Sequence, residues 1–296
     1  MEHRLTGSRP SAPAPVGRTR LFKDGFLYTS SGTESKSSRH SASLLLSLTD
    51  AGFEIEAAGQ VQRARAVAVR PFAAKRLRAC GVPFACVDAS TNHPLYRAFA
   101  FLPEPGFLVL PPEAFSATAS SLDVFNQGMM SARACRLLFQ RLFDIAQELL
   151  PRPPLLDARI QRVIDLLEDD HSLGVAELAT AVHLSRDRLS HLFTQEMGLP
   201  LRKYSQSLKI RAAARLLGSG LNFTQIAAAA GFTDSAHFSK IWSQAYGASP
   251  TFFYTSGRVS FYPPSAVRIE GSSGVSSRFR SRNAANSHDL MPTTKV

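Results

Sequence analysis

The stretch ELATAVHLSRDRLSHLFTQEMG, residues 177–198, is followed by a second stretch of the same pattern, QIAAAAGFTDSAHFSKIWSQAYG, residues 225–247. Four positions of the two copies are separated by a constant 49 residues: Ser185 and Asp234, Leu189 and Phe238, Phe193 and Trp242, Gly198 and Gly247. A repeat this regular indicates two copies of one supersecondary unit. Each copy predicts a short apolar helix, a turn, and a longer helix capped by Ser or Asp, which is the pattern of a helix-turn-helix.

In the first copy, the longer helix is predicted to begin after Ser185 and to end at Met197, with Gly198 just beyond it. Its apolar residues recur at helical spacing and predict the buried face: Leu189, Leu192, Phe193 and Met197. The polar residues left on the outer face are Arg186, Asp187, Ser190, His191, Thr194 and Gln195. Side chains of these types exchange hydrogen bonds with base edges and phosphates.

In the second copy, Asn222 and Gln225 form a capping-box pattern at the start of the short helix. Asp234 is predicted to cap the longer helix, whose outer face then carries Ser235, Ala236, Ser239 and Lys240. Lys240 lies 49 residues after His191, so both copies present a hydrogen-bond donor at this position. Ala236 offers only a methyl group, which suits contact with thymine.

The two copies resemble the DNA-binding domain of the AraC/XylS family of bacterial transcriptional regulators. The matching segments are ELATAVHLSRDRLSHLFTQEMGLPLRKY, AARLL and FTQIAAAAGFTDSAHFSKIWSQAYGASPTFF, within residues 157–254. The resemblance implies base contacts from Asp187, Ser190, His191 and Thr194 in the first copy and from Ser235, Ala236 and Lys240 in the second. A linker helix over 201–217 would hold the two longer helices about one DNA turn, ~34 Å, apart. The family's frequent linker arginine is Lys209 here.

Composition along the chain predicts five segments: a disordered tail (1–20), a β-like domain with helices at its end (21–150), a Pro-rich linker (151–156), a helical DNA-binding domain (157–257) and a disordered basic tail (258–296). The β-like texture rests on short apolar runs at 43–48, 61–69, 95–102 and 107–110. The family resemblance implies a cupin-like barrel for sensing or dimerisation. The predicted fold class is α+β: an N-terminal cupin-like β-barrel with following helices, and a C-terminal all-α domain with two helix-turn-helix motifs joined by a linker helix.

A heptad-like seam precedes the linker, at Cys135, Leu138, Leu142, Ile145 and Leu149. It spans about two heptads, which is shorter than a coiled coil usually needs. Two interpretations stay open at this point: the seam packs onto the chain's own β domain, or it forms a homodimer interface.

Charge and composition limit the class of protein further. The net charge is +11, and residues 1–40 and 258–296 each carry an excess of four positive charges, so the basic excess lies mostly outside the reading faces. No apolar stretch approaches the ~20 residues of a membrane helix, and the N-terminus lacks a signal-peptide pattern, so a cytoplasmic protein without membrane contact is predicted. The cupin metal pattern is absent because His40 and His93 stand alone, so we expect no metal and no cofactor.

These patterns favour a sequence-specific transcriptional regulator, an activator by family resemblance, that binds double-stranded promoter DNA. The resemblance adds RNA polymerase as a partner and allows a small-molecule effector and a homodimer. One alternative is a cupin-type enzyme fused to a DNA-binding module, although the chain shows no nucleophile–base spacing, so no enzyme is predicted. A second alternative is a non-specific architectural DNA binder, which would depend steeply on salt.

Overall fold

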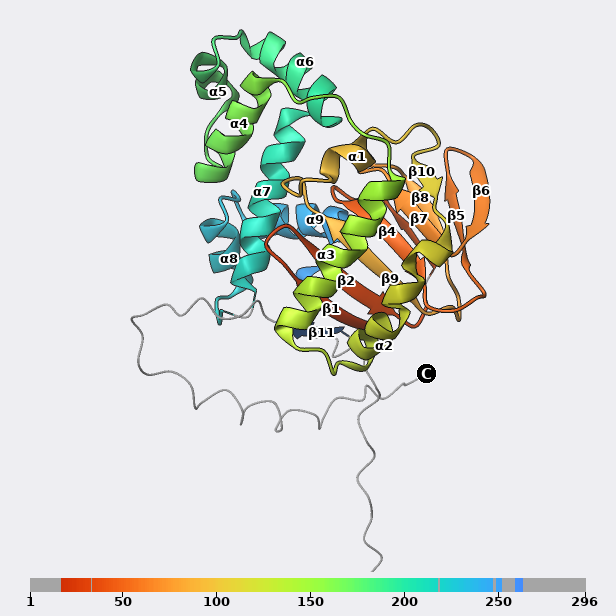
Figure 1. Ribbon diagram of the computed structural model, residues 1–296. Coiled ribbons are helices and arrows are strands. Elements are labelled where there is room, and N and C mark those ends of the chain that lie inside the picture. The colour runs from red at the N-terminus through yellow and green to blue at the C-terminus, as the bar shows by residue number, and fades with distance from the viewer. Residues whose placement is uncertain (1–16, 33, 218, 247–248, 252–258, 263–296) are drawn as a thin grey trace, which may run out of the picture. The chain divides into compact units, whose positions relative to one another are not determined.

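The computed structural model describes residues 17–32, 34–217, 219–246, 249–251 and 259–262, all within one compact unit. A β-rich N-terminal domain is followed along the chain by a helical C-terminal domain (Figure 1). Among the described residues, no helix has the length and apolar character required to cross a membrane.

The N-terminal domain contains two sheets. A seven-stranded sheet has the order β10-β7-β4-β9-β2-β1-β11, and a four-stranded sheet has the order β3-β8-β5-β6. The strands of the first are β1 Gly17–Leu21, β2 Gly25–Ser30, β4 Ala42–Ser47, β7 Ala66–Val69, β9 Phe84–Ala89, β10 Phe107–Val109 and β11 Val259–Tyr262. Those of the second are β3 Glu34–Ser37, β5 Phe53–Ala57, β6 Gln60–Ala64 and β8 Lys75–Arg78. Neighbouring strands are antiparallel, apart from the parallel pair β1 and β11.

Three sequence predictions need correction. Strand β1 begins inside the predicted tail 1–20, and β11 lies inside the predicted tail 258–296, because each completes its backbone hydrogen bonds on the other. The remainder of both tails lies outside the described residues. The apolar run 95–102 contains a helix, α1 Tyr96–Ala100, because its largest side chains, Tyr96 and Phe99, recur at helical spacing and are buried together.

Helices cover one face of the seven-stranded sheet (Figure 1). They are α1, a 3₁₀ helix at Pro112–Thr118, α2 Ala119–Gln127 and α3 Ala132–Leu149. Ser131 caps α3 by accepting a hydrogen bond from the Ala134 amide at 3.2 Å, and the helix stops before Pro151. The seam on α3 is buried against this sheet from Cys135 to Ile145. Of the two interpretations of the seam, the structure supports packing onto the chain's own β domain. Residues buried in this core are not available to a second copy.

The C-terminal domain consists of six helices among the described residues. They are α4 Ala158–Asp169, α5 Val175–Ala181, α6 Arg186–Met197, α7 Leu201–Leu216, α8 Phe223–Ala229 and α9 Ser235–Tyr246. The side chains of α4, α5, α6 and the first half of α7 join the same apolar cluster as the covered face of the seven-stranded sheet. Those of α8, α9 and the second half of α7 form a separate cluster.

A polar network lies between the two sheets, in an otherwise apolar layer. Asp88 on β9 is fully buried and pairs with Arg39, whose Nη1 is 2.8 Å from Asp88 Oδ2. The other carboxylate oxygen accepts hydrogen bonds from the hydroxyls of Ser41 and Ser43. Arg39 also donates to the Tyr28 hydroxyl at 3.2 Å. A buried ion pair satisfied in this way is tolerated, whereas either charge alone would be costly.

We expect Asp88→Ala to lower the free energy of unfolding by about 3–5 kcal/mol, because it leaves the partly buried Arg39 guanidinium without its counter-ion. The double variant Arg39→Met, Asp88→Leu should lose less than the single variant, since it removes both charges together. Urea denaturation of the full chain measures both. A double variant less stable than Asp88→Ala would contradict this account of the pair.

Candidate nucleic-acid interface

In the helix pair α5–α6, the longer helix begins and ends at the residues that the sequence predicted. The Ser185 hydroxyl accepts from the Arg188 amide at 3.2 Å, and α6 ends at Gly198 in the left-handed conformation. In the pair α8–α9, Asn222 and Gln225 form the predicted capping box, and Asp234 accepts from the His237 amide at 2.6 Å. This backbone hydrogen bond lowers the pKa of Asp234, so the cap is charged at neutral pH.

The turns of the two pairs also match. The Leu184 amide donates to the Ala179 carbonyl at 3.0 Å, and the Phe232 amide donates to the Ala227 carbonyl at 2.9 Å. Each turn contains one residue with positive φ, which is His183 in the first pair and Gly231 in the second. The repeat seen in the sequence is therefore a repeat of capping, turn and helix in the structure.

The inner and outer faces of α6 divide as predicted. Leu189, Phe193 and Met197 are buried, and Leu192 is half-buried. The predicted outer residues Arg186, Asp187, His191, Thr194 and Gln195 are exposed, and Ser190 is half-buried. The hydroxyls of Ser190 and Thr194 each donate at 2.8 Å to a carbonyl one turn earlier, Arg186 O and Ser190 O respectively. Their oxygens keep lone pairs for an incoming donor.

On α9, the predicted inner residues Phe238, Ile241 and Trp242 are buried. The predicted outer residues divide by exposure: Ala236 and Lys240 are exposed, whereas Ser235 and Ser239 are half-buried. The structure thus brings each predicted set of residues onto one helix face.

Two further residues at these faces were missed by the sequence analysis. Arg188 is exposed on α6, and His237, at the matching position of α9, is half-buried. The His237 ring lies 3.2 Å from the Thr233 hydroxyl and packs edge-on against Phe232. Both residues follow the helix cap by three positions, and the constant spacing of the repeat could have found them.

Helix α7 joins the two pairs and fixes each of them differently. Tyr204 in its first half is buried against Phe193, with ring centroids 5.3 Å apart. In its second half, Ala213 and Ala214 are buried in the cluster of α8 and α9. Lys209 donates to the Gly231 carbonyl at 2.7 Å and so ties the helix to the turn of the second pair. The buried face of α7 therefore changes along its length, because each half packs against a different core.

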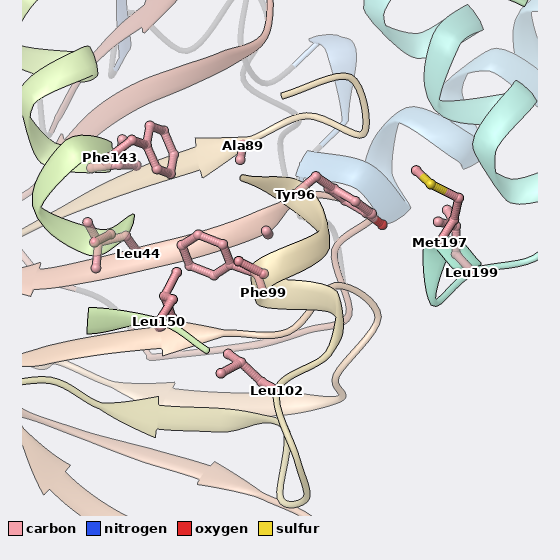
Figure 2. Packing of buried hydrophobic residues seen from close by; sticks show 14 of the residues in the cluster. Leu44, Ala89, Tyr96, Phe99, Leu102, Phe143, Leu150, Met197 and Leu199 are labelled. Carbon is pink, nitrogen blue, oxygen red and sulfur yellow. The ribbon is translucent and has the colours of Figure 1, made fainter. Parts of the chain in front are cut away.

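The end of α6 also contacts the N-terminal domain. Arg97 on α1 donates to the Glu196 carbonyl at 2.8 Å and to the Pro154 carbonyl at 2.8 Å. Its guanidinium lies 3.4 Å from the Glu196 carboxylate, which also accepts from the Asp157 amide. Figure 2 follows the apolar cluster beside this contact, with Leu44, Phe99 and Tyr96 on one side and Met197 and Leu199 on the other. Arg97 thereby caps the last turn of α6.

A family model described as a helix-turn-helix domain matches residues 178–255. The arabinose operon regulatory protein of Escherichia coli K12 is 31% identical over 157 residues, covering 48% of this chain and 53% of that protein. The transcriptional activator RhaS of Escherichia fergusonii is 35% identical over 130 residues, covering 42% of this chain and 47% of that protein. The helix-turn-helix region of this chain is of the AraC/XylS type.

The match to these curated relatives of the AraC/XylS family spans about half of their length. A solved structure of ToxT from Vibrio cholerae has a similar fold over a longer span. The structural match covers 80% of this chain and 97% of ToxT, with a TM-score of 0.51 and 12% sequence identity. At this identity the likeness concerns the fold alone: a β-rich N-terminal domain followed by a helical C-terminal domain.

We expect Arg97→Met to loosen the last turn of α6, because the Glu196 carbonyl loses its side-chain donor. Hydrogen exchange should become faster at the Gly198 amide, which bonds to the Thr194 carbonyl at 2.9 Å. Arg152→Met is the matched control, since Arg152 is an exposed arginine of the nearby linker. Equal exchange in the two variants would show that Arg97 does not hold this turn.

Proposed function

We propose that this chain is a sequence-specific DNA-binding regulator of transcription. In this proposal α5–α6 and α8–α9 are two helix-turn-helix motifs, and α6 and α9 are their recognition helices. The observation that carries it is the structural repeat: two capped helices with buried apolar faces turn polar side chains outward at matched positions. The match to the helix-turn-helix family model, residues 178–255, contains both α6 and α9.

The recognition helices would enter successive segments of the major groove. Helix α7 has 16 residues, a length of about 24 Å, and holds both pairs through Tyr204 and Lys209. The residues assigned to the DNA interface are Arg186, Asp187, Ser190, His191, Thr194, Gln195, Ser235, Ala236, Ser239 and Lys240. His191 and Lys240 would donate to base edges, and Ala236 would contact a thymine methyl group.

Phosphate contacts would add affinity without specifying sequence. Arg188 and His237 stand three positions after the caps, near the first turns of α6 and α9. At α6, the guanidinium of Arg188 beside the helix N-terminus favours an anion. This part of the affinity would therefore fall as salt is raised.

The other parts of the proposal rest on the resemblance to the AraC/XylS family. The N-terminal domain would be a cupin-like barrel that responds to a small-molecule effector, and the chain would activate transcription together with RNA polymerase. A homodimer is also proposed, but it would have to use a surface other than the seam on α3, which is buried within the chain.

We expect His191→Ala and Lys240→Ala each to weaken binding to a specific site by ~1–3 kcal/mol, because each removes one donor to a base edge. Both side chains are exposed, so neither change should alter stability. Lys23→Ala, an exposed lysine of the N-terminal domain, is the charge-matched control for Lys240. Fluorescence anisotropy with a labelled duplex measures the affinities, and unchanged values for both variants would remove these residues from the interface.

Selection of DNA sites from a random pool by the full-length protein tests the proposal as a whole. Two enriched boxes about one helical turn apart are expected, since α7 joins two similar reading units. A single enriched box would mean that only one helix pair reads sequence. Binding without enrichment, with a steep salt dependence, would instead support the non-specific architectural binder.

A further inference from the structure

A cleft of about 440 Å³ lies within the C-terminal domain, where α5, α6 and the first turns of α7 meet. Pairs of its lining residues are spaced three or four positions apart, so each pair shares one face of its helix. These pairs are Val175 and Leu178 on α5, Ser190 and Thr194 on α6, and Arg202 and Ser205 on α7. Since Ser190 and Thr194 are assigned to the DNA interface, the cleft borders the reading face of α6.

Arg202 gives the cleft a positive charge. It is exposed, and no other residue of the lining is charged. Within the part of the chain that the structure describes, no hydrogen bond or ion pair engages its side chain. Other arginines of this domain are engaged: Arg159 pairs with Asp157, and Arg211 pairs with Glu168. The guanidinium of Arg202 is therefore available to an anion that approaches α6.

The rest of the cleft does not compete with this charge. A carboxylate near it, that of Glu177 on α5, accepts a hydrogen bond from the Gly174 amide at 2.8 Å and so completes a helix cap. The apolar part of the lining includes Val175, which is 38% exposed, and Pro200, which is also exposed. A cation beside exposed apolar surface suits a group that has both a negative and an apolar part.

The hydroxyl groups of the cleft are weaker candidates for binding an anion. Those of Ser190 and Thr194 donate at 2.8 Å to carbonyls one turn earlier, and that of Ser205 donates to the Leu201 carbonyl at 3.2 Å. A hydroxyl has a single hydrogen, so an anion would have to take it from one of these carbonyls. Arg202 is therefore the main donor of the cleft.

The repeat shows that this cation belongs to the first helix pair alone. At three matched positions the first pair has arginine, whereas the second pair has serine, histidine or threonine: Arg186 and Ser235, Arg188 and His237, Arg202 and Thr251. The reverse holds at one position, where Lys240 matches His191. The first pair thus has more positive charge to offer to the DNA backbone.

We propose that this cleft receives one deoxyribose-phosphate unit of the DNA backbone, at the edge of the base pairs that α6 reads. The Arg202 guanidinium bonds to the phosphate, because its planar donors match phosphate oxygens. Val175 and Pro200 contact the sugar. The inference rests on the proposed function and deepens it, because it names a backbone contact outside the recognition helix. Such a contact fixes the register of α6 on the duplex.

The salt dependence of binding tests the charge of Arg202. Fluorescence anisotropy measures the affinity of the full-length protein for the selected duplex over a range of salt concentrations. Arg202→Met should reduce the slope of log K against log salt by about 0.9 and weaken binding roughly five- to tenfold near ~0.1 M salt. Arg202→Lys should keep most of the slope, since it keeps the charge. Arg162→Met, an exposed arginine of α4 outside the lining, should change neither quantity.

Neutral methylphosphonate groups, placed one at a time along each strand, locate the contact. The box read by α6 is the one whose base preference His191→Ala relaxes. In the wild-type protein, neutralising one phosphate at the edge of this box should weaken binding. Arg202→Met should abolish that loss, because both changes remove the same interaction. Losses at the other phosphates should be equal in the two proteins.

Three outcomes would overturn the proposal: equal salt slopes for the wild type and Arg202→Met, an equal loss in Arg162→Met, or phosphate losses that Arg202→Met leaves in place throughout the duplex. Binding of inorganic phosphate, with DNA affinity unchanged in Arg202→Met, would put a free anion in the cleft and also overturn it. Each outcome can occur while two boxes are still enriched, so it is distinct from failure of the proposed function. If no box is enriched, salt slopes on an unrelated duplex still measure the Arg202 contact.

Discussion

A single apolar cluster connects the seven-stranded sheet to the first helix pair, and the arrangement of the helical domain depends on it. Phe99 on α1 and Met197 at the end of α6 both belong to this cluster, and Arg97 adds polar contacts beside it. The second helix pair has a cluster of its own. Its last helix also touches the sheet, because the rings of Tyr246 on α9 and Phe26 on β2 lie 5.4 Å apart. A change in the N-terminal domain would therefore reach both α6 and α9 through packed side chains.

The polar contacts in this molecule serve two different ends. Between the sheets, Asp88 uses both carboxylate oxygens, one on Arg39 and the other on the hydroxyls of Ser41 and Ser43. In the helical domain, the caps at Ser185 and Asp234 use their side chains on the backbone and leave the following turns open to solvent. The charges between the sheets are used within the protein, whereas the first turns of α6 and α9 keep polar side chains on the surface.

Local features of the sequence predicted much of the helical domain. Caps, turns and buried faces of α6 and α9 depend on residues within a few positions of each other, so the repeat identified them. The seam on α3 was different, because its period predicts an apolar face but not the surface that covers it. Strands β1 and β11 lie about 240 residues apart and complete each other, and Arg97 contacts Glu196 across 99 residues. Contacts of this kind leave no local pattern in the sequence.

Strand β11 gives the N-terminal sheet an outer strand that comes from beyond the helical domain. The chain leaves this sheet, forms α4 to α9, and returns to pair with β1 over four residues. The N-terminal domain is therefore not a contiguous piece of sequence. A fragment that stops at the linker would expose the hydrogen-bonding groups of β1 as a bare sheet edge, and such an edge pairs readily with a strand of another molecule.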